Sequence, residues 1–108
     1  MDCVAEVVYH EAQGEGETGM RAVAHVIYNR AEQRGITPCQ VVRQPFQFAR
    51  GGYIGNNSAW RMAQRVSENP GTDITHGATY FHNLTVRPRW AYNMTVTFRF
   101  GNHIFYRS

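Results

Sequence analysis

Three of the eight acidic residues of this chain lie within seven positions, directly after an apolar run: Glu11, Glu15 and Glu17. If residues 3–13 form a helix, Glu11 shares one helical face with the apolar residues Val4 and Val8. A carboxyl group on an apolar face is partly desolvated, which raises its pKa. General acid catalysis needs a carboxylic acid that stays protonated near neutral pH. Glutamates near helix ends are also often solvated or capping residues, so this pattern alone does not establish catalysis.

Glu15 lies four residues after Glu11, and a continuous helix would place both carboxylates on one face. Gly14 instead predicts the end of the helix with a left-handed cap, so we expect Glu15 and Glu17 in a loop. Two carboxylates flanking a glycosidic bond are the usual glycosidase arrangement. The alternative uses a single acid and lets a hydroxyl group of the sugar attack.

Other catalytic chemistries find little support. His10-Glu11 opens like a zinc-protease motif, but Gly14 stands where the second histidine should be. The three histidines after residue 75 could converge in space, yet their spacing fits no familiar ligand pattern. Neither cysteine has cationic or glycine neighbours that would lower its pKa, and no Gly-x-Ser-x-Gly motif is present. We therefore expect no metal ion and no cofactor.

The composition predicts one domain of 108 residues with a net charge of +3, and all eleven basic residues are arginine. This charge favours acidic partners such as cell-wall polymers or nucleic acid, but no nucleic-acid-binding motif is present. No run is long and apolar enough to span a membrane. The N-terminus does not resemble a signal peptide because Asp2 and Glu6 interrupt its apolar core. Cys3 and Cys39 could pair, but two reduced, buried thiols are the favoured interpretation.

Apolar spacing and capping residues predict four helices, and together with the C-terminal segment an α+β class. The expected helices are residues 3–13, Gly19–Gln33 with Thr18 as N-cap, a short helix after Thr37-Pro38, and Ala59–Glu68 with Ser58 as N-cap. Gly35 should end the second helix. Residues 94–100 alternate with period two, and Gly101-Asn102 then predicts a hairpin turn into a strand over residues 103–106.

Aromatic side chains could stack on sugar rings along a groove: Phe46, Phe48, Tyr53, Tyr80, Phe81 and Trp90. Gln47, His82 and Asn83 could form hydrogen bonds with hydroxyl and acetamido groups. The alternative for the phenylalanines is the core, because a small domain needs large side chains to fill it. That interpretation is favoured for Phe81 and for the phenylalanines of the C-terminal hairpin.

These pieces, in this order, resemble the catalytic domain of SleB-like cell-wall hydrolases, the family of the bacterial spore cortex-lytic enzyme. The matching segments are Glu11-Ala12-Gln13-Gly14-Glu15, Gly19 through Arg30, Val41-Val42 leading to Phe46-Gln47-Phe48, Gly77 through Asn83, Trp90, and Gly101 through Tyr106. The Glu-Ala-x-Gly-Glu motif and the Asn29-Arg30 pair carry most of the specificity.

The resemblance implies a lysozyme-like fold and activity on peptidoglycan. Spore members of the family are lytic transglycosylases, which cut the β-1,4 bond between N-acetylmuramic acid and N-acetylglucosamine and leave a 1,6-anhydro sugar. The resemblance also assigns the role of catalytic acid to Glu11 and a supporting role to Glu15. The implied substrate-binding residues are Glu15, Phe46, Gln47, Phe48, Tyr80, His82, Asn83 and Trp90.

We expect the chain to differ from the spore enzymes by lacking their signal peptide and their N-terminal peptidoglycan-binding domain. A compact version without a leader is typical of a bacteriophage lysin, released by a holin or carried in the virion. We therefore expect a monomer that acts on the cell wall and inserts into no membrane. Three alternatives stay open: a hydrolytic muramidase, a catalytically silent wall-binding or virion module, and a metal-dependent amidase or peptidase using His82 and His103.

Overall fold

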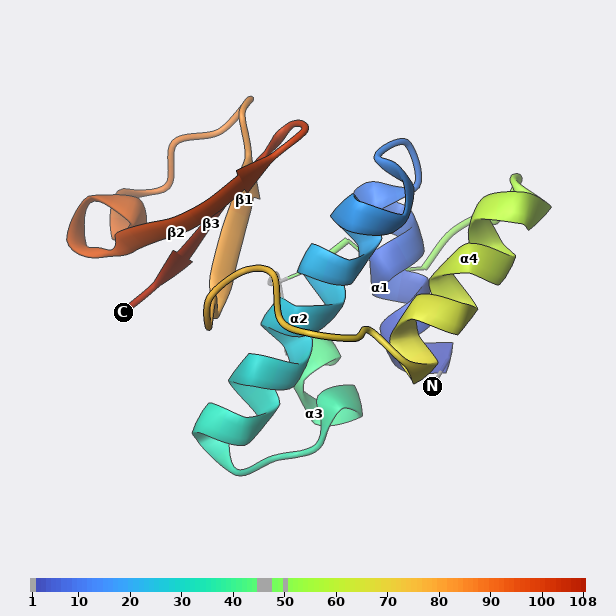
Figure 1. Cartoon of the computed structure of the whole chain (residues 1–108), viewed down its shortest axis with the longest axis horizontal. Coiled ribbons are helices and arrows are strands. Elements are labelled where there is room, and N and C mark those ends of the chain that lie inside the picture. The colour runs from blue at the N-terminus through green and yellow to red at the C-terminus, as the bar shows by residue number, and fades with distance from the viewer. Residues whose placement is uncertain (1, 45–47, 50) are drawn as a thin grey trace.

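The structure, a computed structural model, describes residues 2–44, 48–49 and 51–108, and within them a helical half and a sheet half are distinct (Figure 1). The helices are α1 (Asp2–Ala12), α2 (Gly16–Arg34), α3 (Pro38–Val42) and α4 (Asn57–Glu68), and the strands are β1 (Tyr80–Asn83), β2 (Thr95–Phe100) and β3 (His103–Arg107). A 3-10 helix, η1 (Arg89–Asn93), connects β1 to β2. The predicted α+β class is confirmed, with a third strand added to the expected hairpin.

Helix α2 lies between the sheet and the other helices (Figure 1). On one side Val23 and Ile27 are fully buried in the core shared with α1, α3 and α4. On the opposite side Ala22 and Val26 pack with Phe105 of β3. Because α2 is apolar on two sides, it joins the helical half to the sheet.

Local chemistry explains where some helices end. Gly35 has a left-handed backbone (φ 65°), and its N–H donates to the carbonyls of the last turn of α2, as predicted. Thr37 and Gln40 form a capping box at the start of α3, and Pro38 occupies the first turn. The N-cap of α4 is Asn56, whose side chain accepts from the N–H of Ala59, so the prediction of Ser58 was wrong by two residues.

The connection from α1 to α2 is tighter than the sequence suggested. Glu15 is already the N-cap residue of α2, so the prediction of Thr18 as the cap was wrong. The left-handed residue is Gly16 (φ 69°) and not Gly14. The chain therefore turns within residues 13–15, and this short turn brings the side chains of Glu11 and Glu15 to one edge of the helical half.

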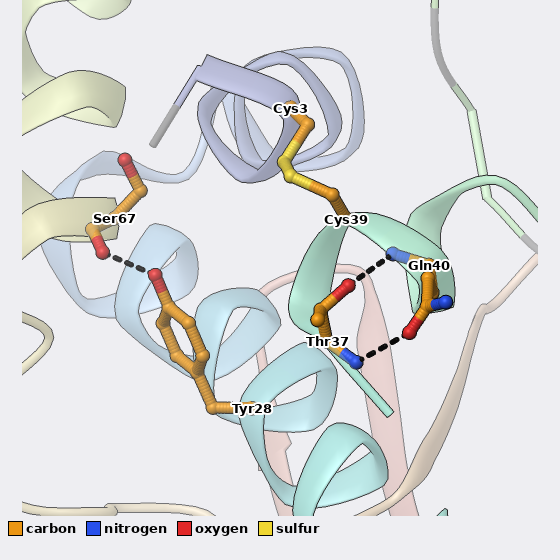
Figure 2. The surroundings of a disulfide bond; sticks show 6 residues. All are labelled: Cys3, Tyr28, Thr37, Cys39, Gln40 and Ser67. Atoms are coloured by element: carbon orange, nitrogen blue, oxygen red, sulfur yellow. Dashed lines mark hydrogen bonds between the residues drawn. A yellow bond between two sulfur atoms is a disulfide. The ribbon is translucent and has the colours of Figure 1, made fainter. Parts of the chain in front are cut away.

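Cys3 and Cys39 form a disulfide bond, which corrects the expectation of two reduced thiols (Figure 2). Their Cα atoms lie 5.6 Å apart, and the bond joins the start of α1 to α3. Nearby, the hydroxyl of Tyr28 on α2 donates to the carbonyl of Ser67 on α4 (Figure 2). The N-terminal end of α1 is thus linked covalently to a segment that follows α2, while α2 and α4 are joined by a hydrogen bond.

The three strands form an antiparallel sheet in the order β1-β3-β2. His103 and Phe105 of β3 face the helices, whereas Ile104 and Tyr106 lie on the outer face. A bulge interrupts the pairing of β2 between Val96 and Phe98. None of the described helices is both long and apolar enough to cross a lipid bilayer.

Candidate functional site

A cleft of about 560 Å³ lies where the end of α1, the start of α2 and the tip of the sheet meet. The described residues that line it are His10, Glu11, Gln13, Gly14, Glu15, Ala49, Asn83, Leu84, Thr85, Asn102 and His103. Glu11 and Glu15 are the carboxylates in this lining. The cleft is therefore the place where the acidic motif of the sequence can meet a ligand.

Glu11 lies in the last turn of α1, one turn after Val7 and Val8, which are fully buried. Its side chain is partly buried, and Oε2 accepts a hydrogen bond of 2.9 Å from the backbone N–H of Ala49. Burial raises the pKa of Glu11; the Ala49 N–H and the nearby charges of His103 and His10 oppose this increase without cancelling it. The predicted raised pKa is confirmed, and the carboxyl group is suited to donate a proton into the cleft.

Arg30 of α2 packs against Phe48, the residue that precedes Ala49. The guanidinium lies 4.8 Å from the ring centre of Phe48 and 4.5 Å from that of Tyr80, and its Nε donates to the carbonyl of Thr79 over 2.8 Å. Burial lowers the pKa of Arg30 to about 10, and the nearby charge of Arg34 adds to this. Phe48 and Tyr80 thus pack on a buried arginine, and Phe48 directly precedes Ala49, whose N–H donates to Glu11. Neither aromatic residue is in the lining of the cleft.

Glu15 bridges the two halves of the molecule. Its Oε1 lies 2.6 Å from Nδ1 of His103, and its Oε2 accepts from the backbone N–H of Asn102 over 2.5 Å. The side chains of Glu15 and His103 are only 12% and 5% exposed. Gly101 is required here, because its backbone is left-handed (φ 57°) and an added Cβ would lie 2.1 Å from Oε2 of Glu15. Both oxygens of Glu15 are therefore engaged in holding the hairpin turn against the helical half.

The remaining predicted site residues separate into three groups. Asn83 lines the same cleft as Glu11, and its Oδ1 accepts from the N–H of Thr85 over 2.9 Å. His82 and Trp90 lie on the outer face of the sheet, where Trp90 packs against Tyr80, His82 and Tyr106. Phe46 and Gln47 fall outside the described residues. As direct contacts to substrate, all of these residues stay predictions.

The sequence did not predict that Asn102 and Leu84 line the cleft, and it suggested His103 only as a possible metal ligand. His103 pairs with a glutamate 88 positions earlier in the chain, so no local pattern points to it. The hypothesis of a metal bound by His82 and His103 finds no geometric support, because the two side chains lie on opposite faces of the sheet. His82 stacks on Tyr106 outside, whereas His103 contacts Phe81 and Phe105 inside.

Comparison with known proteins gives one family and a consistent set of relatives. The family described as "Cell Wall Hydrolase" matches residues 14–106. The spore cortex-lytic enzyme of Halalkalibacterium halodurans is 33% identical over 109 residues, which cover 94% of this chain and 33% of that protein. The chain therefore spans about a third of the length of this curated relative.

Two solved structures resemble nearly the whole chain. The catalytic domain of the Bacillus cereus SleB protein has a TM-score of 0.77 at 27% identity, covering 97% of this chain and 87% of that one. The catalytic domain of the germination-specific lytic transglycosylase SleB from Bacillus anthracis has a TM-score of 0.76, also at 27% identity, covering 97% of this chain and 91% of that one. The overall arrangement of helices and sheet is thus shared with these domains.

Proposed function

Because this chain belongs to the cell wall hydrolase family, as its SleB-like motifs predicted, we propose that it is a lytic transglycosylase of peptidoglycan. Its substrate bond is the β-1,4 linkage between N-acetylmuramic acid and N-acetylglucosamine. One observation carries this proposal: Glu11 presents a partly desolvated carboxyl group of raised pKa in the cleft. The family match begins at residue 14, so the role of Glu11 rests on this geometry and on its motif.

In the proposed reaction the protonated Glu11 donates its proton to the glycosidic oxygen, which leaves as the 4-hydroxyl of N-acetylglucosamine. Positive charge develops at C1 of the muramic acid. The Glu11 carboxylate then removes the proton from the 6-hydroxyl of the same sugar, and O6 bonds to C1. The product is a 1,6-anhydro ring, Glu11 is protonated again, and no water is consumed.

The state of Glu15 favours this one-acid mechanism over hydrolysis with two carboxylates. A second carboxylate that acts as nucleophile or base needs a free oxygen directed at the sugar or at a water molecule. Both oxygens of Glu15 accept short hydrogen bonds from the hairpin, at 2.6 Å and 2.5 Å. Among the described residues of the cleft this leaves Glu11 as the carboxylate available for chemistry.

The test is digestion of purified sacculi followed by mass spectrometry of the released muropeptides. We expect 1,6-anhydro-muramic ends, each lighter by one water than the corresponding reducing end. Reducing muramic ends without anhydro products would support the alternative, a hydrolytic muramidase acting on the same bond. Absence of any cleavage would favour a catalytically silent wall-binding module.

A further inference from the structure

A second groove, of about 360 Å³, lies on the outer face of the sheet, on the side away from α2. The segment between β1 and β2 forms one wall through Leu84, Val86 and Tyr92. Ile104 and Val96 of the sheet form the floor. The proposed reaction uses none of these side chains, so the groove needs an explanation of its own.

Several large apolar side chains that line the groove are exposed. Leu84, Val86 and Tyr92 are 56%, 48% and 80% exposed, and Val96 is 41% exposed. These four are among the five large hydrophobic residues that the described part of the chain leaves exposed. Scattered exposed apolar residues are normal, but a group that lines one groove is typical of a binding surface.

The groove adjoins the candidate catalytic cleft. Leu84 lines both of them. Its backbone N–H donates to the carbonyl of Asn102 over 2.9 Å, which fixes Leu84 against the hairpin turn that Glu15 holds. A polymer bound in the cleft therefore has its side branches close to the entrance of the groove.

The charge in the groove has one sign. Arg87 is exposed in its wall, and no Asp or Glu is among the described lining residues. Three other titratable groups are among the described lining residues: His82 and Tyr106, which are hydrogen-bonded to each other over 2.7 Å, and Tyr92, which is exposed. The second ring nitrogen of His82 lies 2.8 Å from the carbonyl of Asn83. Arg87 is thus the side chain in this lining that is suited to pair with a carboxylate.

We propose that this groove binds the stem peptide of peptidoglycan, an inference that rests on the proposed function of the cleft. The stem is attached to the lactyl group of N-acetylmuramic acid, so it branches from a glycan held beside Glu11. It carries alanine methyl groups, which suit Leu84 and Val86, and free carboxylates, which suit Arg87. The groove volume of about 360 Å³ is in the range of small-molecule sites and fits a few residues of peptide.

The experiment compares two substrates: glycan strands with intact stems, and the same strands after an amidase has removed the stems. Cleavage is measured as kcat/KM for wild type, Arg87→Gln and Tyr92→Ala, with Arg61→Gln as a control because Arg61 is exposed on α4, away from the sheet. Loss of one charge-assisted hydrogen bond corresponds to roughly a tenfold change in affinity. We expect Arg87→Gln to lower kcat/KM about tenfold on stem-bearing strands, mainly through KM, and to leave cleavage of stripped strands unchanged.

Tyr92→Ala should have the same selectivity with a smaller effect, and Arg61→Gln should match wild type on both substrates. If Arg87→Gln loses activity equally on both substrates, or on neither, the groove does not bind the stem, while the proposed function of the cleft stands. If wild type cleaves neither substrate, both proposals are overturned. Sedimentation as a dimer that Tyr92→Ala dissociates would assign the groove to a second copy of the chain and overturn the stem proposal.

Discussion

Two partly buried carboxyl groups, Glu11 in the cleft and Asp73 in the loop before β1, show opposite behaviour. Burial acts to raise the pKa of each of them. The pKa of Glu11 ends above its ordinary value, whereas that of Asp73 ends below it. Burial alone therefore does not decide the protonation state, and the number of hydrogen-bond donors around each group explains the difference.

Asp73 accepts four hydrogen bonds. Its donors are the N–H of Thr75 (2.8 Å), the hydroxyl of Thr75 (2.6 Å), the N–H of Gly77 (3.0 Å) and the amide of Asn29 (2.9 Å). Asn29 also donates to the carbonyl of Ala78 over 2.9 Å, so the loop is attached to α2. Glu11 accepts from the N–H of Ala49 and borders the open cleft. Asp73 is satisfied by hydrogen bonds within the fold, whereas Glu11 still has lone pairs that can interact with a ligand in the cleft.

The largest expected effect is the loss of catalysis in Glu11→Gln. The amide keeps the size of the side chain but cannot donate and recover a proton, so cleavage of sacculi should fall by about 10²–10⁴-fold. Glu17→Gln is the matched control, because Glu17 is exposed in the same acidic stretch. Turbidity clearing of a peptidoglycan suspension measures the effect. Clearing by Glu11→Gln at the wild-type rate would show that Glu11 is not the acid.

The second-largest expected effect concerns Glu15, which lines the cleft and accepts hydrogen bonds with both of its carboxylate oxygens. Glu15→Gln leaves a donor facing either the N–H of Asn102 or the ring nitrogen of His103, and breaking a buried pair of this kind costs about 3–5 kcal/mol. We expect a much lower free energy of unfolding in urea. In the fraction that stays folded, KM should rise more than kcat falls, because the hairpin turn at the cleft loses its anchor. An unchanged free energy of unfolding with a collapsed kcat would instead make Glu15 a catalytic residue.

Asp73→Asn should affect stability and leave chemistry intact. The amide nitrogen of asparagine would face a donor such as the N–H of Thr75, a fully buried residue, and leaving one buried donor unpaired costs about 1–3 kcal/mol. Because Asp73 is not in the cleft lining, kcat on sacculi should match wild type at a temperature where the variant is folded. Thermal unfolding monitored by circular dichroism measures the loss. A fall in kcat without a fall in stability would end the contrast between the two carboxyl groups.

Features set by neighbouring residues were predictable from the sequence. The cap of α3 at Thr37 and the end of α2 at Gly35 follow from short-range chemistry, and the apolar face that desolvates Glu11 follows from helical periodicity. The dipeptide Gly101-Asn102 by itself predicts the hairpin turn between β2 and β3. These predictions are confirmed because the decisive atoms lie within a few positions of each other.

Features that depend on packing between distant elements were not predictable. The disulfide of Cys3 and Cys39 needs α1 and α3 to be adjacent, which the spacing of two cysteines does not reveal. Period-two alternation does place His103 and Ile104 on opposite faces of a strand. It does not say which face meets α2, and therefore which residues of the strand lie on the side of the cleft and which on the side of the second groove. The second groove could not be predicted for the same reason.

The smallest predicted effect is a change in the pH dependence of stability. It tests the contrast most directly, because the free energy of unfolding depends on the pKa values of both Glu11 and Asp73. A raised pKa in the folded state stabilises the protein below the ordinary value of 4.5 for Glu11, and this contribution is lost as pH rises through the folded pKa. A lowered pKa stabilises the protein above the ordinary value of 3.8 for Asp73, and this contribution is lost as pH falls through the folded pKa.

Urea unfolding of wild type, Glu11→Gln and Asp73→Asn from pH 3 to pH 7 measures these contributions, and the two variants should differ from wild type in opposite ways as pH changes. Glu11→Gln should gain stability relative to wild type as pH rises from about 4 towards neutrality, whereas the deficit of Asp73→Asn should shrink as pH falls below about 4. Parallel curves for the three proteins would mean that neither carboxyl group has a pKa shifted by folding, and that Glu11 is not held in the state that a general acid requires.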